Sequence, residues 1–277
     1  MTTSLFDLTD RVAVVSGGAQ GMGRSMATAF AGAGADVVLA DINLEGAEKT
    51  AASLRELGRR AIAVECDVSS PEAIDGLFAT VDKEFGQVDI LGNVAGEGVM
   101  CDPLELKLSD LERVLWSLAI GRFYMCQQAA KRMIPQGRGS IMSLGSIASE
   151  RALGRGHLAY SMGMGAVVTM TRELSTEWSA KGVRVNAILP AQTINPGLEK
   201  RYAENPNVRK RHLTGLPVGR FGKSDDIQTV ALFLASDASS FITGVTLPMD
   251  GGNLAMTAGG SPMSWGDTDT VNGIDKW

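Results

Sequence analysis

Short, continuously apolar segments alternate with longer segments whose apolar residues recur at helical spacing. Residues 12–15 and 37–39 are apolar runs of the first kind, and the small-residue segment between them predicts a helix over about 23–32. In residues 44–57, Ala47, Ala51 and Leu54 share one helical face. The expected strands are 11–16, 36–40, 61–65, 90–94, 140–144, 183–189 and 245–249, and the expected helices are 23–32, 44–57, 71–85, 109–135, 158–180 and 225–234.

This alternation predicts a single α/β domain built on a parallel sheet of about seven strands. A strand that reads as an unbroken apolar run is buried on both faces, as strands are in a parallel sheet covered by helices. Right-handed crossovers then give the doubly wound, Rossmann-type arrangement. We expect residues 1–253 to form this domain. We expect residues 254–277 to be a tail that packs on a subunit interface or over a substrate mouth, because aromatic anchors interrupt a polar segment.

Composition and charge exclude several classes of function. The chain has 277 residues, 44% of them hydrophobic, and a formal net charge of −5, which argues against a nucleic-acid partner or an acidic membrane surface. Cys66, Cys101 and Cys126 form no close pair, so we expect no metal site and a reducing compartment. There is neither a basic, apolar leader nor an apolar run of about 18 residues, so we expect a cytoplasmic protein without a membrane partner.

A glycine-rich segment connects the first expected strand to the first expected helix. Residues 16–23 read Ser-Gly-Gly-Ala-Gln-Gly-Met-Gly. Glycines allow a tight turn and a close backbone approach to a pyrophosphate, while the helix N-terminus offers free N–H groups. A simple turn that needs a positive φ would explain one glycine but not three at this spacing. The phosphate-binding residues predicted from this segment are Ser16, Gly17, Gln20, Gly21, Met22 and Gly23.

An aspartate ends the second expected strand. The carboxylate of Asp41 can accept both hydroxyls of an adenosine ribose and would repel a 2′-phosphate. Neither Ile42 nor Asn43 is an arginine, and the glycine-rich segment contains no cation. We therefore predict NAD(H) rather than NADP(H) as the cofactor, with Asp41 and Ile42 at the ribose. The alternative is a solvated aspartate at a strand end.

Four further groups of residues follow expected strands, at the edge where such a sheet binds its ligand. They are Asp67-Val68, Asn93-Val94-Ala95-Gly96, Ser146 with Tyr160, and Pro190-Ala191 with Asn195. Together with the glycine-rich segment, they make residues 8 to about 253 resemble the classical short-chain dehydrogenase/reductase family. The resemblance implies a dinucleotide-binding and catalytic domain that interconverts an alcohol and a ketone.

The resemblance also implies roles for individual residues. Ser146 would position the oxygen of a small-molecule substrate, and Tyr160 would exchange a proton with that oxygen. Asp67 and Val68 match the adenine-contacting pair of the family. The positions that match its nicotinamide-side contacts are Asn93, Ala95, Gly96, Tyr160, Pro190 and Asn195. The family further implies a homo-oligomer, a tetramer or a dimer, assembled through the long helices over 109–135 and 158–180.

Two positions depart from the pattern of the family. Met164 stands where the family has a lysine, one helical turn after Tyr160, and Leu118 stands where it has a structural asparagine. A phenol has a pKa of about 10, and a cation ~5 Å away at an effective dielectric constant of about 20 stabilises its ionised form by roughly 3 kcal/mol. Met164 cannot supply this charge. His157, three residues before Tyr160, is either a general acid or base in its place or an ordinary loop residue.

These departures leave three interpretations. The chain is an NAD(H)-dependent oxidoreductase of secondary alcohols and ketones with an atypical site at Ser146 and Tyr160. Alternatively, it is a non-redox enzyme that catalyses elimination or isomerisation on the same fold, or a catalytically weak cofactor-binding subunit. The intact serine–tyrosine pair and the glycine-rich segment favour the first interpretation.

Overall fold

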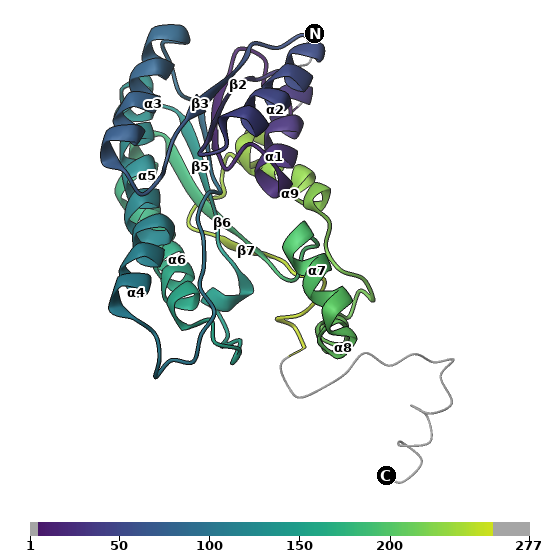
Figure 1. Cartoon of the computed structure of the whole chain (residues 1–277). Helices are drawn as coiled ribbons and strands as arrows, with labels where there is room; N and C mark the ends of the chain where they lie inside the picture. Colours follow the sequence, from purple (N-terminus) through teal and green to yellow (C-terminus); the bar gives the residue numbers. More distant parts are fainter. Residues whose placement is uncertain (1–4, 257–277) are drawn as a thin grey trace. The chain divides into compact units, whose positions relative to one another are not determined.

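The computed structural model describes residues 5–256 and contains a seven-stranded parallel β-sheet (Figure 1). Its strands are β1 (Val12–Ser16), β2 (Asp36–Asp41), β3 (Ala61–Glu65), β4 (Ile90–Asn93), β5 (Gly139–Leu144), β6 (Val183–Pro190) and β7 (Thr246–Met249). They lie in the order β3-β2-β1-β4-β5-β6-β7. Because the order runs outward in opposite directions from β1 and β4, the predicted doubly wound α/β fold is confirmed.

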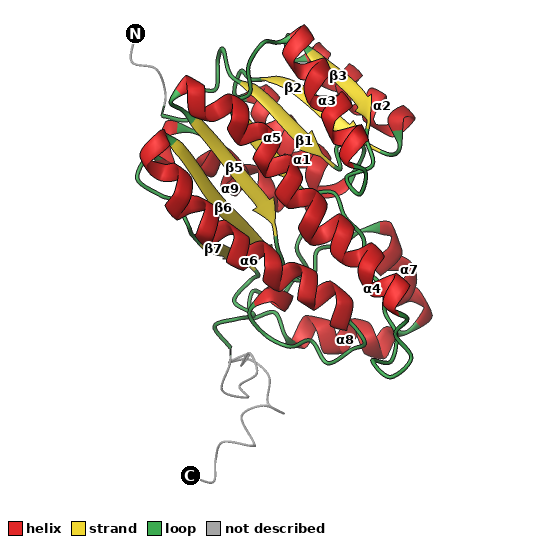
Figure 2. Ribbon diagram, turned by 90° about the vertical axis from the view of Figure 1, so that its left-hand side faces the viewer, coloured by secondary structure: helices red, strands yellow, loops and turns green. Residues whose placement is uncertain are grey.

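Helices cover both faces of this sheet (Figures 1 and 2). One face carries α1 (Gly21–Gly32), α2 (Leu44–Glu56) and α9 (Ile227–Ala235), and the other carries α3 (Pro71–Glu84), α5 (Gly121–Gln136) and α6 (Leu158–Trp178). Phe30 and Leu234 are fully buried in the core of the first face, and Phe78 and Met125 in that of the second. Burial on both sides explains why the strands read as unbroken apolar runs.

The helix expected over 109–135 is interrupted. It consists of α4 (Leu108–Leu115), a π-helical turn over Trp116–Ile120, and α5. Gly121 begins α5 and is pressed against the loop after β3, where a Cβ atom on it would lie 1.8 Å from the carbonyl oxygen of Val68. A π turn inserts one extra residue into a helix and leaves no mark in an apolar pattern, so the sequence could not predict it.

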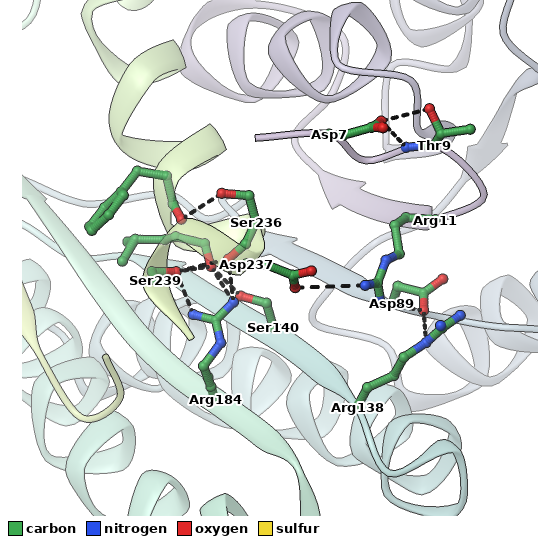
Figure 3. Close-up of polar contacts among 12 residues, drawn as sticks. Asp7, Thr9, Arg11, Asp89, Arg138, Ser140, Arg184, Ser236, Asp237 and Ser239 are labelled. Atoms are coloured by element: carbon green, nitrogen blue, oxygen red, sulfur yellow. Dashed lines mark hydrogen bonds and ion pairs between the residues drawn. The ribbon is translucent and has the colours of Figure 1, made fainter. Parts of the chain in front are cut away.

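A buried carboxylate joins strands at the amino edge of the sheet (Figure 3). Asp89 is 2% exposed and accepts hydrogen bonds from the backbone N–H of Val12 and from Nε of Arg138, each at 2.9 Å. An Nη atom of Arg11 lies 3.6 Å from the same carboxylate. Nearby, Arg184 donates to backbone carbonyl oxygens at the end of α9 and just after it. These contacts stabilise the edge of the sheet opposite the carboxyl ends of its strands.

The described chain divides into two compact units. The sheet and the helices above belong to the first, which comprises residues 5–190 and 224–249. The second comprises residues 191–223 and 250–256, with α7 (Pro196–Glu204) and α8 (Pro206–Thr214) packed around Tyr202 and Phe221. The expectation of one domain over residues 1–253 stays a prediction. Most of the expected tail, residues 257–277, lies outside the described residues.

Candidate active site

A pocket of about 410 Å³ opens at the carboxyl ends of β1 to β4. It lies where the strand order reverses between β1 and β4, which is where open α/β sheets bind ligands. Its lining residues are Gly17, Gln20, Asp41, Ile42, Cys66, Asp67, Val68, Ser69, Val94, Ala95, Gly96, Glu97 and Ser117. The pocket thus brings together most of the residues predicted to contact the adenosine and phosphate groups of a dinucleotide.

The glycine-rich turn between β1 and α1 needs its glycines for two different reasons. Gly17 and Gly21 adopt φ values of +71° and +58°, a region that disfavours side chains. Gly23 is needed for space, because a Cβ atom there would lie 2.0 Å from the carbonyl oxygen of Gly17. Gln20 occupies the cap position of α1 without a side-chain hydrogen bond to the helix. The amides of the first turn therefore remain available to a phosphate group.

Ser16 and Asn93 lie behind the pocket, and neither lines it. Both are fully buried. The Ser16 hydroxyl accepts hydrogen bonds from the backbone N–H groups of Val94 (2.9 Å) and Ala95 (3.1 Å). The Asn93 amide donates to the carbonyl oxygen of Arg122 at 2.9 Å. These side chains hold the segment after β4 in place, so they shape the cofactor site from below.

Asp41 is oriented by two backbone amides. Its Oδ2 accepts a hydrogen bond from the N–H of Ala19, and its Oδ1 accepts one from the N–H of Asn43, each at 2.9 Å. The carboxylate thereby connects the glycine-rich turn to the end of β2. Among the described residues that line the pocket there is no lysine or arginine. The donors, the glycine cradle and the carboxylate fit an adenine dinucleotide.

The part of the pocket that follows β3 contains a thiol and a second aspartate. Asp67 accepts a hydrogen bond from the N–H of Ser69 at 2.8 Å, which orders the turn before α3. Burial raises the pKa of the neighbouring Cys66 thiol to about 11, and the charge of Asp67 acts in the same direction. Cys66 is therefore neutral at physiological pH and contributes packing rather than nucleophilic chemistry.

Ser146 and Tyr160 lie on adjacent, contacting elements. Ser146 follows β5, is 8% exposed, and its Oγ accepts a hydrogen bond from the N–H of Ala148 at 3.1 Å. It precedes the 3₁₀ turn Ile147–Ser149, which packs against α6. Tyr160 lies in the first turn of α6, and its ring is 6.1 Å from that of His157, between centroids and inclined by 59°.

Apolar packing surrounds Met164 and Leu118, the two positions where the sequence analysis expects a departure from the family. Met164 and Leu118 are each 1% exposed and belong to one buried cluster, against which Tyr160 packs. A Cβ atom on Gly163 would lie 2.8 Å from Cβ of Leu118, so α6 and the π turn are in close contact.

A buried arginine beside this cluster was not identified from the sequence. Arg122 is 2% exposed and donates from Nε to the carbonyl oxygen of Ala95 (3.0 Å) and from Nη2 to that of Val94 (2.9 Å). Its Nη1 donates to the carbonyl oxygen of Leu144. Burial lowers the pKa of Arg122 to about 10, opposed by the acidic groups of Tyr160 and Cys126. Arg122 therefore stays protonated at neutral pH. The only signal in the sequence is an arginine between Gly121 and Phe123, inside an otherwise apolar helix face.

Besides Ser16 and Asn93, the predicted cofactor contacts outside the pocket lining are Gly21, Met22, Gly23, Tyr160, Pro190 and Asn195. Pro190 is buried at the end of β6, where it pairs with Met249 of β7. Asn195 belongs to the second unit, where its side chain accepts a hydrogen bond from the N–H of Leu198 at 2.9 Å and caps α7. Their roles at the nicotinamide stay predictions.

Comparison with known proteins identifies the family. Residues 17–253 match the family described as Enoyl-(Acyl carrier protein) reductase. The chain is 37% identical over 247 residues to D-threitol dehydrogenase of Mycolicibacterium smegmatis, covering 89% of this chain and 94% of the relative. It is 37% identical over 252 residues to NAD-dependent glycerol dehydrogenase of Listeria innocua, covering 89% and 95%.

The fold agrees with solved structures. One from Agrobacterium tumefaciens, provisionally assigned as a 2-deoxy-D-gluconate 3-dehydrogenase and containing bound NADP, superimposes with a TM-score of 0.83 at 30% identity. The match covers 91% of this chain and 99% of that one. With the glycine-rich turn, the pocket and the Ser146–Tyr160 pair, these similarities show that the chain is an oxidoreductase of the short-chain dehydrogenase/reductase family.

Proposed function

We propose that this protein interconverts a secondary alcohol and a ketone with NAD(H) as cofactor. The observation that carries the proposal is the segment after β4. Its residues 94–97 line the dinucleotide pocket, and the next residue, Gly98, packs against the Tyr160 ring, where an added Cβ atom would lie 3.0 Å from Cδ2. The candidate proton-transfer residue is therefore next to the candidate cofactor site.

The reaction needs a group that moves a proton at the reacting oxygen. When bound, a nicotinamide cofactor supplies or accepts the hydride. An alcohol that loses hydride must also lose its hydroxyl proton, and the Tyr160 phenol is placed to take it. The Ser146 Oγ accepts from the Ala148 amide, which leaves its own hydrogen free to be donated to the substrate oxygen. Gly17, Gln20, Asp41 and Asp67 would hold the adenosine and phosphate groups.

His157 supports a second route for the proton. Its ring lies 6.1 Å from the ring of Tyr160, so one water molecule between them would complete a relay toward solvent. Imidazole titrates near neutral pH, which suits proton exchange with Tyr160. We keep His157 as a candidate relay residue that acts through Tyr160.

Asp41 supports NAD(H) over NADP(H) as the preferred cofactor. We expect NAD(H) to bind at least ~10-fold more tightly than NADP(H), a difference of about 1.4 kcal/mol, because the fixed carboxylate would repel a 2′-phosphate. Fluorescence titration with NADH and NADPH measures the ratio. Asp41→Ser should reduce it to near unity. Asp36→Asn, at the other end of β2, is the matched control and should leave it unchanged. Equal affinities in the wild type would contradict the assignment.

Exposed apolar side chains support assembly into a homo-oligomer, a tetramer or a dimer. Trp116, Ile120 and Phe123 of the π turn and α5 are 40%, 44% and 41% exposed, and Leu158 and Met162 of α6 are each 45% exposed. Such a surface on two neighbouring helices is typical of a subunit interface.

We expect light scattering at micromolar concentration to report an even-numbered oligomer. Phe123→Glu should shift it toward smaller species, because a carboxylate would be buried in the interface. Leu57→Glu replaces another exposed apolar residue, 51% exposed and following α2, and should not. A monomeric wild type would overturn this proposal.

The relatives also indicate the class of substrate. The similarity to polyol and hydroxysteroid dehydrogenases favours a small-molecule alcohol as substrate. Within residues 5–256, no helix is both long and apolar enough to cross a membrane. The cytoplasmic location expected from the sequence remains a prediction.

A further inference from the structure

Arg122 differs from the other basic residues of the protein in its degree of burial. Within residues 5–256 it is the only lysine or arginine that is buried, with 2% of its surface exposed. Its guanidinium donates to three carbonyl oxygens, those of Val94 and Ala95 after β4 and that of Leu144 at the end of β5. These are the carboxyl ends of the two strands that precede the cofactor segment and Ser146. The charge therefore lies inside the active-site edge of the sheet.

This cation is stabilised without an anion. In the described part of the chain, Arg122 forms no ion pair with a carboxylate, whereas Arg132, ten residues later on α5, is paired with Asp82 at 2.5 Å. The carbonyl dipoles compensate only part of the loss of hydration, and a neutral side chain of similar volume would avoid that loss. A buried charge of this kind at the edge of an active site suggests a role in the reaction.

The guanidinium is close to Tyr160 through a short series of contacts. A Cβ atom on Gly96 would lie 3.2 Å from Nη2 of Arg122, and one on Gly98 would lie 3.0 Å from Cδ2 of Tyr160. Two residues of the same segment thus contact the two side chains. The α5 and α6 helices that carry Arg122 and Tyr160 also pack on the same face of the sheet (Figure 1). The electrostatic effect of Tyr160 on Arg122 agrees with this proximity.

We propose that Arg122 is a positioning residue whose buried positive charge stabilises the phenolate of Tyr160 during proton transfer. The inference rests on the proposed alcohol–ketone function and assigns the source of charge for that site. Met164, one turn after Tyr160, is buried and apolar and cannot serve. The positive charge is instead supplied by Arg122 of α5, which contacts the segment after β4.

The other ionisable groups around the pair do not replace this charge. Cys126 faces Arg122 from the same helix, and burial raises the pKa of its thiol to about 11, so it is neutral near pH 7. Glu97, on the segment that reaches Tyr160, is paired with Arg113 at the surface. The ring of His157 lies 6.1 Å from that of Tyr160, between centroids. Arg122 is the buried group in this set that is positive at neutral pH.

The kinetic test compares Arg122→Gln, Arg122→Lys and wild type in oxidation of secondary alcohols with NAD⁺, from about pH 5 to about pH 10. In the wild type, turnover is expected to rise with pH and then level off, because alcohol oxidation needs a base at the reacting oxygen. Loss of the cation should move this rise up by about one pH unit. Arg122→Gln should therefore be about 10-fold slower below the rise and approach wild type above it. Arg122→Lys should keep a profile close to that of the wild type.

Arg132→Gln is the matched control, because it makes the same change on the same helix and breaks a surface ion pair. It should lower stability slightly and leave the pH profile in place. NADH affinity of Arg122→Gln should stay within about 3-fold of wild type. A uniform loss at every pH, or a shifted profile in Arg122→Lys, would show that Arg122 only holds the loops together. If Arg122→Gln is unfolded by circular dichroism, Arg122→Met, which also removes the charge, takes its place in the comparison with Arg122→Lys.

A spectroscopic test separates this inference from the proposed function. Alkaline titration of tyrosinate absorbance is measured in the wild type and in Arg122→Gln, each with and without Tyr160→Phe, to isolate the signal of Tyr160. The signal should appear about one pH unit higher in Arg122→Gln. If wild type oxidises no alcohol but the signal shifts, the proposed function fails and the role of Arg122 stands. If wild type is active and the signal does not move, the assignment of Arg122 is overturned.

Discussion

Replacing Tyr160 with phenylalanine is expected to reduce alcohol oxidation by about 10³-fold, because no group then remains to take the proton from the reacting oxygen. The substitution removes one oxygen atom from a ring that packs on the Met164–Leu118 cluster, so the fold should not change. The cofactor pocket does not include Tyr160 in its lining, and NADH affinity should stay within about 3-fold of wild type. Steady-state turnover and fluorescence titration measure the two quantities.

Tyr124→Phe is the matched control for this experiment. The hydroxyl of Tyr124 donates to Asp75 at the surface at 2.7 Å, and its loss should lower stability only slightly without affecting turnover. If Tyr160→Phe kept the turnover of the wild type, Tyr160 could not be the residue that takes the proton from the alcohol. The non-redox and the cofactor-binding interpretations would then have to explain the dinucleotide pocket.

The relatives weigh against those two interpretations. D-threitol dehydrogenase and NAD-dependent glycerol dehydrogenase cover almost the whole chain and are both dehydrogenases. An elimination or isomerisation would not need a dinucleotide pocket, yet the described chain keeps the glycine-rich turn and Asp41 in a geometry that fits one. A weak cofactor-binding subunit would not need Ser146 just after β5, on an element that contacts α6, which carries Tyr160.

Local patterns predicted the sheet and the cofactor turn because each depends on a few neighbouring residues. The strand β3 matches its predicted bounds, Ala61–Glu65, because it combines apolar residues with turn residues on both sides. The positive φ of Gly17 and Gly21 follows from the tight turn after β1. The position of Asp41 at the end of β2 follows directly from the length of that strand. Each of these features lies within a short sequence window.

Arg122 and the π turn could not be predicted in this way. Arg122 is buried because three carbonyl groups from β4 and β5 converge on it, and these groups are 22 to 28 residues away along the chain. Gly121, directly after the π turn, lies against the carbonyl of Val68, a contact that also joins distant segments. The same holds for Ser117, which the π turn places in the pocket lining. Features created by long-range packing leave no periodic signal in the sequence.

Gly23→Ala is expected to weaken dinucleotide binding by about 100-fold, or about 2.8 kcal/mol. A Cβ atom at this position would lie 2.0 Å from the carbonyl oxygen and 2.7 Å from the carbonyl carbon of Gly17, and neither backbone atom can rotate away. The turn must therefore move apart from α1. That motion displaces the amides of the first helical turn, which would otherwise bind the phosphate groups. NADH titration measures the loss, and circular dichroism checks that the fold persists.

Gly32→Ala provides the matched control, because it makes the same substitution at the other end of α1. An added Cβ atom there meets no atom within 4 Å, and the residue is exposed. Alanine should favour the helix by about 0.5–1 kcal/mol, so this variant should melt slightly higher and bind NADH as the wild type does. If Gly23→Ala bound NADH equally well, close packing of Gly23 on Gly17 could not be a requirement of the cofactor site. If both variants lost affinity, the cause would be a change in α1 as a whole rather than in the glycine-rich turn that precedes it.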